Sequence, residues 1–281
     1  MNSNGSTKAA KKIEFPVSTG LVITTGDKQG WSLKRVTAGF PWLTILSIMT
    51  ALTLWDTIGR LGLFRAVPAV SKVWDAWLEL YSGDLLSVLG TSATTFLWGF
   101  SAALAAAVVV SILTSMSKSI DYLLRPYIDA GMSIPITATV PILMMAFGIN
   151  DTTRIAVVFL FAFFTMVISF QAGLEKVDPR HLDMAHALNS SKTQILLKVV
   201  LPSALPLAMT GIRLGVSRAI HGLITAEVIL ATAGIGWLLI RASREFNIPG
   251  IYAVTGTIIV ITVVLMGSVS VLERRIHRVH S

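Results

Sequence analysis

The sequence contains no cysteine and few charged residues. Of its 281 residues, 14% are charged, against about 25% in an ordinary soluble domain. The missing cysteine excludes a disulfide framework, a thiolate nucleophile and any zinc or iron–sulfur site built on cysteine. The scarcity of charge, with a mean hydropathy of +0.72, excludes a water-soluble enzyme, a disordered tail and a collagen-like fibre, because much of a globular chain faces water. The sequence therefore predicts an integral membrane protein.

Motifs that carry chemistry are absent as well. The chain has no Gly-Lys pair, hence no Walker motif for a nucleotide phosphate, and no HExxH, GxSxG or paired-carboxylate pattern. Of its five histidines, only His277 has a carboxylate four residues away, Glu273, and one such pair does not make a metal site. We therefore expect neither catalysis nor a cofactor or metal site in this chain. The net charge of +8 is interpreted as the cytoplasmic excess of Lys and Arg in membrane proteins, not as a nucleic-acid-binding surface.

Long runs without Asp, Glu, Lys or Arg dominate the chain. A helix that crosses a bilayer needs about 20 mostly apolar residues. Five runs reach that length, and a sixth apolar stretch carries three charges. The sequence thus predicts an all-α, polytopic membrane protein with a transmembrane domain at residues 39–273. The six predicted transmembrane helices cover residues 39–60, 86–115, 125–148, 153–174, 200–231 and 250–272.

The distribution of Lys and Arg predicts the orientation of these helices. With both termini inside, 15 of these residues lie on the cytoplasmic side and 6 on the outer side, in agreement with the positive-inside rule. We therefore expect residues 1–38 to form a basic cytoplasmic N-terminal tail and residues 274–281 a basic cytoplasmic C-terminal tail. On the outer side, the spacing of aromatic and apolar residues in 66–84 predicts an amphipathic helix at the membrane interface.

The cytoplasmic connection at residues 175–200 predicts a docking element. Leu182, Ala185 and Leu188 recur on one helical face, so we expect a short amphipathic helix there. Asn189 is suited to the left-handed conformation that ends a helix. The connection is therefore expected to present one helix to a partner on the cytoplasmic face.

A second helix is expected directly after this break. Ser191 and Gln194 form a capping box, which is typical of a helix start. Pro202 and Pro206 follow where the chain enters the membrane again, and they allow a bend there. The docking helix is therefore predicted to be joined rigidly to the fifth span.

The spacing within this connection resembles a motif of the permease subunits of binding-protein-dependent ABC importers. That motif reads Glu-Ala-Ala, three residues, Gly, nine residues, Ile-x-Leu-Pro. The same places are held here by Asp183, Met184, Ala185, Asn189, Val199, Leu201 and Pro202. The substitutions of Asp for Glu, Met for Ala, Asn for Gly and Val for Ile keep acidity, turn geometry and apolarity. The resemblance implies that these seven residues couple the chain to an ATPase.

Further segments are similar to the branch of these importers that transports nitrate, sulfonates, taurine or bicarbonate. The similarity covers residues 40–275. The segments are Gly211-Ile-Arg213, Ala226-Glu227, Gly234-Ile-Gly236-Trp237, Ile134-Pro135, Pro141-Ile-Leu, Phe147-Gly148 and Val271-Leu-Glu-Arg-Arg.

This resemblance implies a permease of the type I ABC importer fold in a bacterial inner membrane. Two copies would enclose one path, and each would dock one ABC ATPase subunit, which would bind the ATP and Mg²⁺. An extracytoplasmic solute-binding protein would deliver the solute. We expect a small, anionic solute such as nitrate, bicarbonate, a sulfonate or an organic carboxylate. The alternative is an ion-coupled secondary transporter, which would need a coupling carboxylate near the membrane midplane.

Four ionisable residues fall on the fifth predicted span, where charges usually face a cavity or a partner. Arg218 and His221 lie one turn apart and could present positive charge to an anion, or could belong to a buried structural ion pair. Glu227 is expected either to line a gate or path, or to cap a helix or pair between subunits. Arg213 lies near the cytoplasmic end, where a structural role is expected because its guanidinium can reach the interface.

Two prolines interrupt the third predicted span. Pro135 and Pro141 free backbone carbonyls, which are tolerated at membrane depth only against protein or a water-filled cavity. Both residues are therefore candidates for lining the path. A kink that serves packing alone is the equal alternative.

Overall fold

The computed structural model describes residues 41–62, 64–83 and 85–279, and the regular structure within these ranges is helical. The predicted N-terminal tail at residues 1–38 lies outside them. The helices are α2 (Pro41–Leu61), α3 (Val70–Ser82), α4 (Leu85–Met116), α5 (Lys118–Ser133), α6 (Ile136–Phe147), α7 (Asp151–Glu175), α8 (Pro179–Ala187), α9 (Lys192–Ile195), the π-helical η1 (Leu196–Val200), α10 (Leu201–Leu230), α11 (Ile235–Arg244) and α12 (Ile248–Val279).

Five of the described helical segments are long and apolar enough to cross a membrane, or six if α5 and α6 together make one broken span. This agrees with the predicted all-α, polytopic fold. Residues 51–281 form one compact unit and residues 1–50 another, and the bundle below belongs to the first unit. The five segments are Trp42–Leu61, Leu85–Met116, Asp151–Glu175, Thr193–Leu230 and Ile248–Val271.

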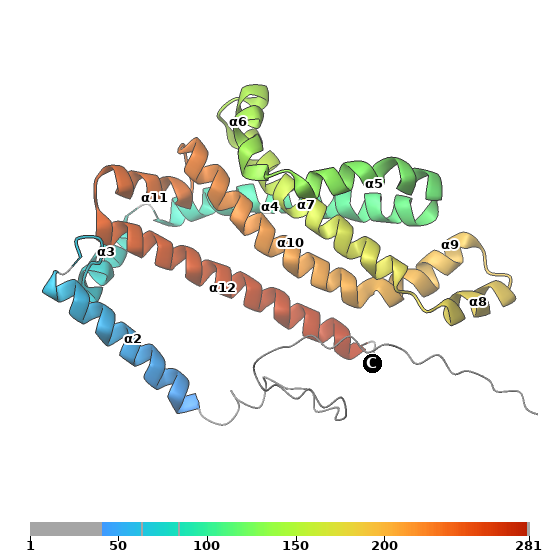
Figure 1. Ribbon diagram of the computed structural model, residues 1–281, viewed down its shortest axis with the longest axis horizontal. Helices are drawn as coiled ribbons and strands as arrows, with labels where there is room; N and C mark the ends of the chain where they lie inside the picture. Colours follow the sequence, from blue (N-terminus) through green and yellow to red (C-terminus); the bar gives the residue numbers. More distant parts are fainter. Residues whose placement is uncertain (1–40, 63, 84, 280–281) are drawn as a thin grey trace, which may run out of the picture. The chain divides into compact units, whose positions relative to one another are not determined.

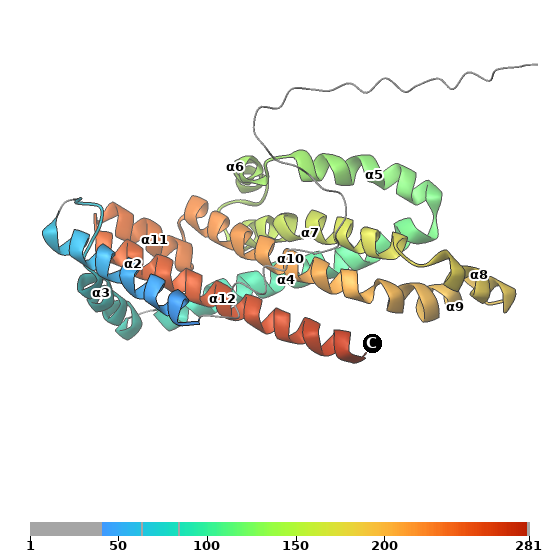
Figure 2. The same cartoon turned by 60° about the horizontal axis from the view of Figure 1, so that its bottom comes forward.

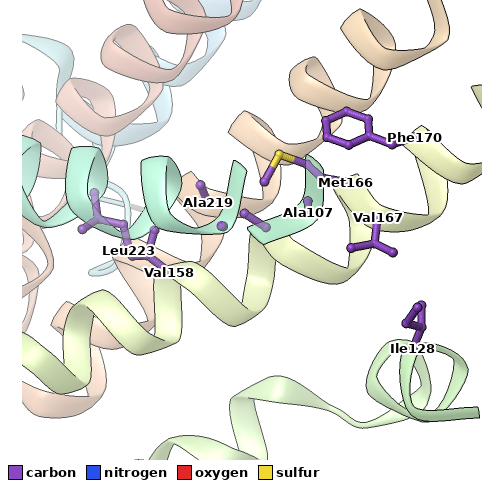
Figure 3. Packing of buried hydrophobic residues seen from close by; sticks show 10 residues of the cluster. Ala107, Ile128, Val158, Met166, Val167, Phe170, Ala219 and Leu223 are labelled. Atoms are coloured by element: carbon purple, nitrogen blue, oxygen red, sulfur yellow. The ribbon is translucent and has the colours of Figure 1, made fainter. Parts of the chain in front are cut away.

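The core of the bundle lies where α7 packs along both α4 and α10 (Figures 1 and 2). Small residues allow this close approach, because a Cβ on Gly99 would come within 2.7 Å of Val158, and one on Gly211 within 2.7 Å of Ser169. Figure 3 shows the buried side chains at this junction. They include Ala103, Ala107, Val158, Ala162, Met166, Val167, Phe170, Ala219 and Leu223, with Ile128 from α5.

The third predicted span, residues 125–148, is interrupted at Pro135, as the sequence predicts, but not at Pro141. It consists of α5 and α6, which meet at 104° and reach the length of a span only together. Pro135 causes the break, because it lacks the N–H that continues a helix and disfavours a helical conformation of the residue before it. Ile134 is accordingly extended, with φ −73° and ψ 127°. Pro141 lies inside α6 without ending it.

Two shorter helices lie at the same end of the bundle, of which the sequence predicted one. The helix expected within residues 66–84 is confirmed as α3, in which Trp74, Trp77 and Tyr81 stack with centroid distances of 5.4 and 5.8 Å. Its position at a membrane interface stays a prediction. The sequence analysis missed α11, which begins after a left-handed residue, Ala231 with φ 50°, has ended α10.

The last helix, α12, continues to Val279, beyond the end predicted at residue 272. Helical backbone therefore extends into the segment predicted to be a cytoplasmic C-terminal tail, residues 274–281. The side chains of that segment lie outside the described residues.

Candidate functional site

The connection between α7 and α10 folds as the predicted helix, break and helix. α8 ends at Ala187, and Asn189 adopts the left-handed conformation with φ 52°. The predicted capping box is confirmed. The Gln194 N–H donates to Ser191 Oγ at 3.3 Å, and the Ser191 N–H donates to Gln194 Oε1 at 2.9 Å. α8 is thereby held to the start of the next helix by a short, defined turn.

After this turn, the chain forms one helical rod from α9 through η1 to the end of α10. The rod has 38 residues from Thr193 to Leu230, which is about 57 Å at 1.5 Å per residue. In η1, the Leu201 N–H donates to the Leu196 carbonyl, a π-helical bond. Pro202 follows directly, and its nitrogen cannot close an α-helical bond one turn back. The expected bend at this proline thus takes the form of a π turn that keeps the rod continuous.

The exposed face of α8 differs from the predicted apolar stripe. Met184 and Leu188, one turn apart, are 59% and 75% exposed, and Asp183 beside them is also exposed. Ala185 is only 7% exposed and therefore faces its own chain, so Ala185 and Leu188 do not share one surface. The side chain of Leu182 lies outside the description. The remaining motif positions are exposed or half-buried, namely Asn189, Val199, Leu201 and Pro202.

A cavity of about 240 Å³ opens at the break between α5 and α6. Arg218 of α10 lines it, together with Pro135 and the hydroxyl-bearing Thr137 and Thr165. Two residues predicted to line a path, Arg218 and Pro135, thus share one cavity. The Arg218 side chain is exposed and makes no ion pair with any residue that the structure describes. A guanidinium in a membrane-spanning helix without a counter-charge is available to a ligand that enters the cavity.

His221 lines a second cavity of about 630 Å³ between α10 and α12. Most of its lining is apolar, and Thr137 borders both cavities. Arg218 and His221 therefore lie on adjoining cavities. Pro141, the other predicted proline, is not among the described residues that line either of them.

Glu227, in the last turn of α10, is 0% exposed. Its Oε1 accepts a hydrogen bond from the Ser92 hydroxyl at 2.7 Å, and its Oε2 accepts one from the Gly236 N–H at 2.9 Å. Of the roles expected for Glu227, this geometry supports capping, because the carboxylate accepts a hydrogen bond from a backbone N–H at the start of α11. Lining a path would require the carboxylate to be exposed.

Arg213 contacts α12, where its Nη1 lies 3.6 Å from Glu273 Oε2. Its side chain is half-exposed, in keeping with the structural role expected for a residue near the end of a span. Both residues belong to segments on which the resemblance rests.

Arg154 is a residue that sequence reasoning missed, because it was counted only as a charge outside the membrane. It is 3% exposed. Its Nη2 donates to Asp151, while Nε and Nη1 have no hydrogen-bond partner among the described residues. The signal in the sequence was its position directly before the uncharged run at 155–174. Because α7 begins after its N-cap residue Asn150, Arg154 lies within the first turn of the helix that carries this run.

Comparison with known proteins gives a consistent set of similarities. The profile of the family described as binding-protein-dependent transport system inner membrane component matches residues 99–278. The chain is 28% identical to the taurine transport system permease protein TauC of Escherichia coli (strain K12), over 89% of this chain and 92% of that protein. It is 30% identical to the putative aliphatic sulfonates transport permease protein SsuC of Bacillus subtilis (strain 168), over 70% and 72%. The crystal structure of an amino acid ABC transporter with histidines shares the fold, with a TM-score of 0.59 at 18% identity, over 70% of this chain and 96% of that one.

Proposed function

Because the chain belongs to the family of binding-protein-dependent transport system inner membrane components, and is therefore an ABC importer permease and not an enzyme, we propose that two copies of it enclose a path for a small sulfonate. The relatives named for taurine and for aliphatic sulfonates support this solute class. Separate ATPase subunits bind the ATP and Mg²⁺ that drive the transport, and an extracytoplasmic binding protein delivers the solute.

The observation that supports an anionic solute is Arg218, which lines a cavity and has no ion-pair partner among the residues that the structure describes. A sulfonate brings one negative charge and three acceptor oxygens, which suit the forked donors of a guanidinium. Thr137 and Thr165 line the same cavity, and their hydroxyls can donate to those sulfonate oxygens that the guanidinium does not bind. The start of α6, which no side chain caps at Pro135, adds the positive end of a helix dipole. Each of these groups favours an anion over a neutral or cationic solute.

The exposed face of α8 supports docking of an ATPase. Met184 and Leu188 place an apolar surface beside Asp183, and a helix with such a surface fits into a groove on a partner. The capping box and the π turn join this helix to α10 without a flexible link. Movement of the ATPase subunits is therefore transmitted along the rod to the turns that carry Arg218.

These assignments define an orientation for the cycle. The end of the rod that bears α8 faces the cytoplasm, together with both termini, and the end next to α11 faces outward. ATP binding draws the two ATPase subunits together and opens the cavity outward to the binding protein, and hydrolysis resets it. An ion-coupled secondary transporter is less well supported, because Glu227, the carboxylate deepest in the predicted spans, is enclosed and engaged by two hydrogen bonds.

Uptake of taurine and ethanesulfonate into proteoliposomes that contain this permease and its ATPase subunits tests the proposal. We expect Arg218→Gln to lower ATP-dependent uptake at least about tenfold, the factor given by 1.36 kcal/mol, while the complex still assembles. The matched control is Arg213→Gln, which removes an arginine from the same helix and should change uptake less than about twofold. Normal uptake by Arg218→Gln would contradict the role of this residue, and uptake only of solutes that lack a sulfonate group would contradict the solute class.

A further inference from the structure

The carboxylate of Glu227 joins three helices at the end of α10 next to α11 (Figure 1). Its oxygens accept from Ser92 of α4 at 2.7 Å and from the N–H of Gly236 in α11 at 2.9 Å. Ser92 Oγ in turn accepts from the Ile235 N–H at 2.9 Å. The N-cap residue of α11, Gly234, offers no side chain, so α4 and α10 satisfy the N–H groups at the start of this helix. Displacing α11 from α10 would leave buried polar groups without partners.

Two glycines allow α11 to approach this carboxylate. Gly234 has φ 88°, which L side chains rarely adopt, and a Cβ there would collide with the Glu227 carboxylate. A Cβ on Gly236 would lie 2.6 Å from Glu227 Cβ and 2.9 Å from the backbone nitrogen of Val228. The contact between α11 and the last turn of α10 therefore leaves no room for a side chain at either position.

A second buried charge acts on this carboxylate. Arg154 of α7 is 3% exposed, with Nε and Nη1 lacking partners among the described residues. Its ion-pair partner, Asp151, is 75% exposed, so water screens that contact on one side. Val157, one turn after Arg154, packs in one buried cluster with Ala226 and Leu230, so the start of α7 lies against the last turn of α10, which carries Glu227. Each charge would be costly to bury alone, and their proximity offsets part of that cost.

We propose that Arg154 is the counter-charge of Glu227 and that these two residues, with Ser92 and Gly236, clamp α11 to the rod. These four residues are called the α11 clamp below. The clamp connects α4, α7, α10 and α11 at one end of the bundle. Its consequence rests on the proposed function: movement imposed by the ATPase at α8 passes along the rod, and the clamp makes α11 follow.

The surface that moves with the clamp is exposed. α11 carries Arg244, which is exposed, and is followed by Phe246, which is 88% exposed and held at φ 53°. α11 thereby delivers the movement of α10 to the surface at the end of the rod opposite α8.

A double-mutant cycle tests the counter-charge. We measure the thermal midpoint of the permease, in detergent with its ATPase subunits, for Arg154→Met, Glu227→Gln and the double variant. Each single change leaves one buried charge uncompensated and should lower the midpoint by about 10 °C. The double variant should lose less than the more damaging single change. The control pairs Arg154→Met with Glu273→Gln, which neutralises the α12 carboxylate that contacts Arg213, and should be additive. Additive losses in Arg154→Met with Glu227→Gln would overturn the counter-charge.

A pair of glycine variants tests whether the clamp transmits movement. Gly236→Ala pushes α11 from Glu227, whereas a Cβ on Gly256 in α12 meets nothing within 4 Å, so Gly256→Ala is the matched control. We expect amide hydrogen exchange in the first turn of α11 to accelerate at least tenfold in Gly236→Ala alone. Taurine uptake per ATP hydrolysed should fall at least fivefold in the same variant.

The outcomes of this pair separate the clamp from the proposed function. Faster exchange with unchanged uptake per ATP would overturn transmission through the clamp. Failure of the unmodified complex to couple ATP hydrolysis to uptake of any solute would overturn the proposed function, while the thermal cycle would still decide the counter-charge.

Discussion

The two halves of α10 are held in opposite ways. In the half nearer α8, the helix contacts α12 through Arg213 and Glu273, a pair 3.6 Å apart with a half-exposed arginine. At the end next to α11, Glu227 is 0% exposed and is held by two hydrogen bonds of 2.7 and 2.9 Å. Exposed pairs contribute little and exchange with water easily, whereas buried networks fix one geometry. The half of α10 nearer α8 is therefore held loosely, whereas the half nearer α11 is held in one fixed arrangement.

The largest expected difference between the two halves comes from truncating one carboxylate in each contact. Glu227→Ala leaves the buried Gly236 N–H without its acceptor and removes the proposed counter-charge of Arg154, and should lower the free energy of unfolding by about 3–5 kcal/mol. Glu273→Ala releases an arginine that water can reach, and should lower it by at most about 1 kcal/mol. Thermal or chemical denaturation of both variants in the same detergent measures the difference. Equal losses would contradict the difference between the buried contact of Glu227 and the more exposed contact of Arg213.

A smaller difference is expected between neighbouring residues of α8, the helix that is proposed to dock the ATPase. Ala185→Arg places a cation at a buried position and should lower the stability of the chain by about 2 kcal/mol. Met184→Arg places it at an exposed position, and should leave the stability within about 0.5 kcal/mol while the ATPase subunits no longer co-purify. Retention of the ATPase by Met184→Arg would show that this face of α8 is not the docking surface.

The smallest difference concerns the two left-handed residues near the ends of the rod. Ala231 has φ 50° and Asn189 has φ 52°, but alanine is strained there while asparagine tolerates it. Ala231→Gly should therefore stabilise the protein by about 1 kcal/mol, and Asn189→Gly by a few tenths at most. The thermal midpoints of the two variants decide this, and a larger gain for Asn189→Gly would run against the strain argument.

The sequence was most informative where a feature depends on local chemistry. The left-handed Asn189, the capping box of Ser191 and Gln194, and the break at Pro135 are encoded within a few residues, and all three are confirmed. Membrane spans also follow from composition, because about 20 apolar residues are needed wherever the helix packs. The long helices could therefore be placed before any contact was known.

The features that were missed or wrong depend on contacts between distant segments. α11 is amphipathic, but its start is capped by residues of other helices. The Ile235 N–H donates to Ser92 of α4, 143 residues away, and the Gly236 N–H donates to Glu227 of α10, 9 residues away. Ala185 fits an apolar stripe by its spacing, yet packing against its own chain removes it from the exposed face. The burial of Arg154 depends on which helices surround it. A charge next to an apolar run is compatible with either side of the membrane boundary.

The π turn at η1 has a consequence for the rotational phase of the rod. A π turn holds about one residue more than an α turn, and one residue corresponds to about 100° of rotation. Every side chain of α10 is therefore turned by that angle relative to a rod that stayed α-helical from Thr193 onward. Arg218 is brought to the cavity at the break between α5 and α6 in this phase, while α8 keeps its own direction. The five residues Leu196–Val200 thus set the angle between the exposed face of α8, which is proposed to dock a partner, and the face of α10 that carries Arg218, which is proposed to meet the solute.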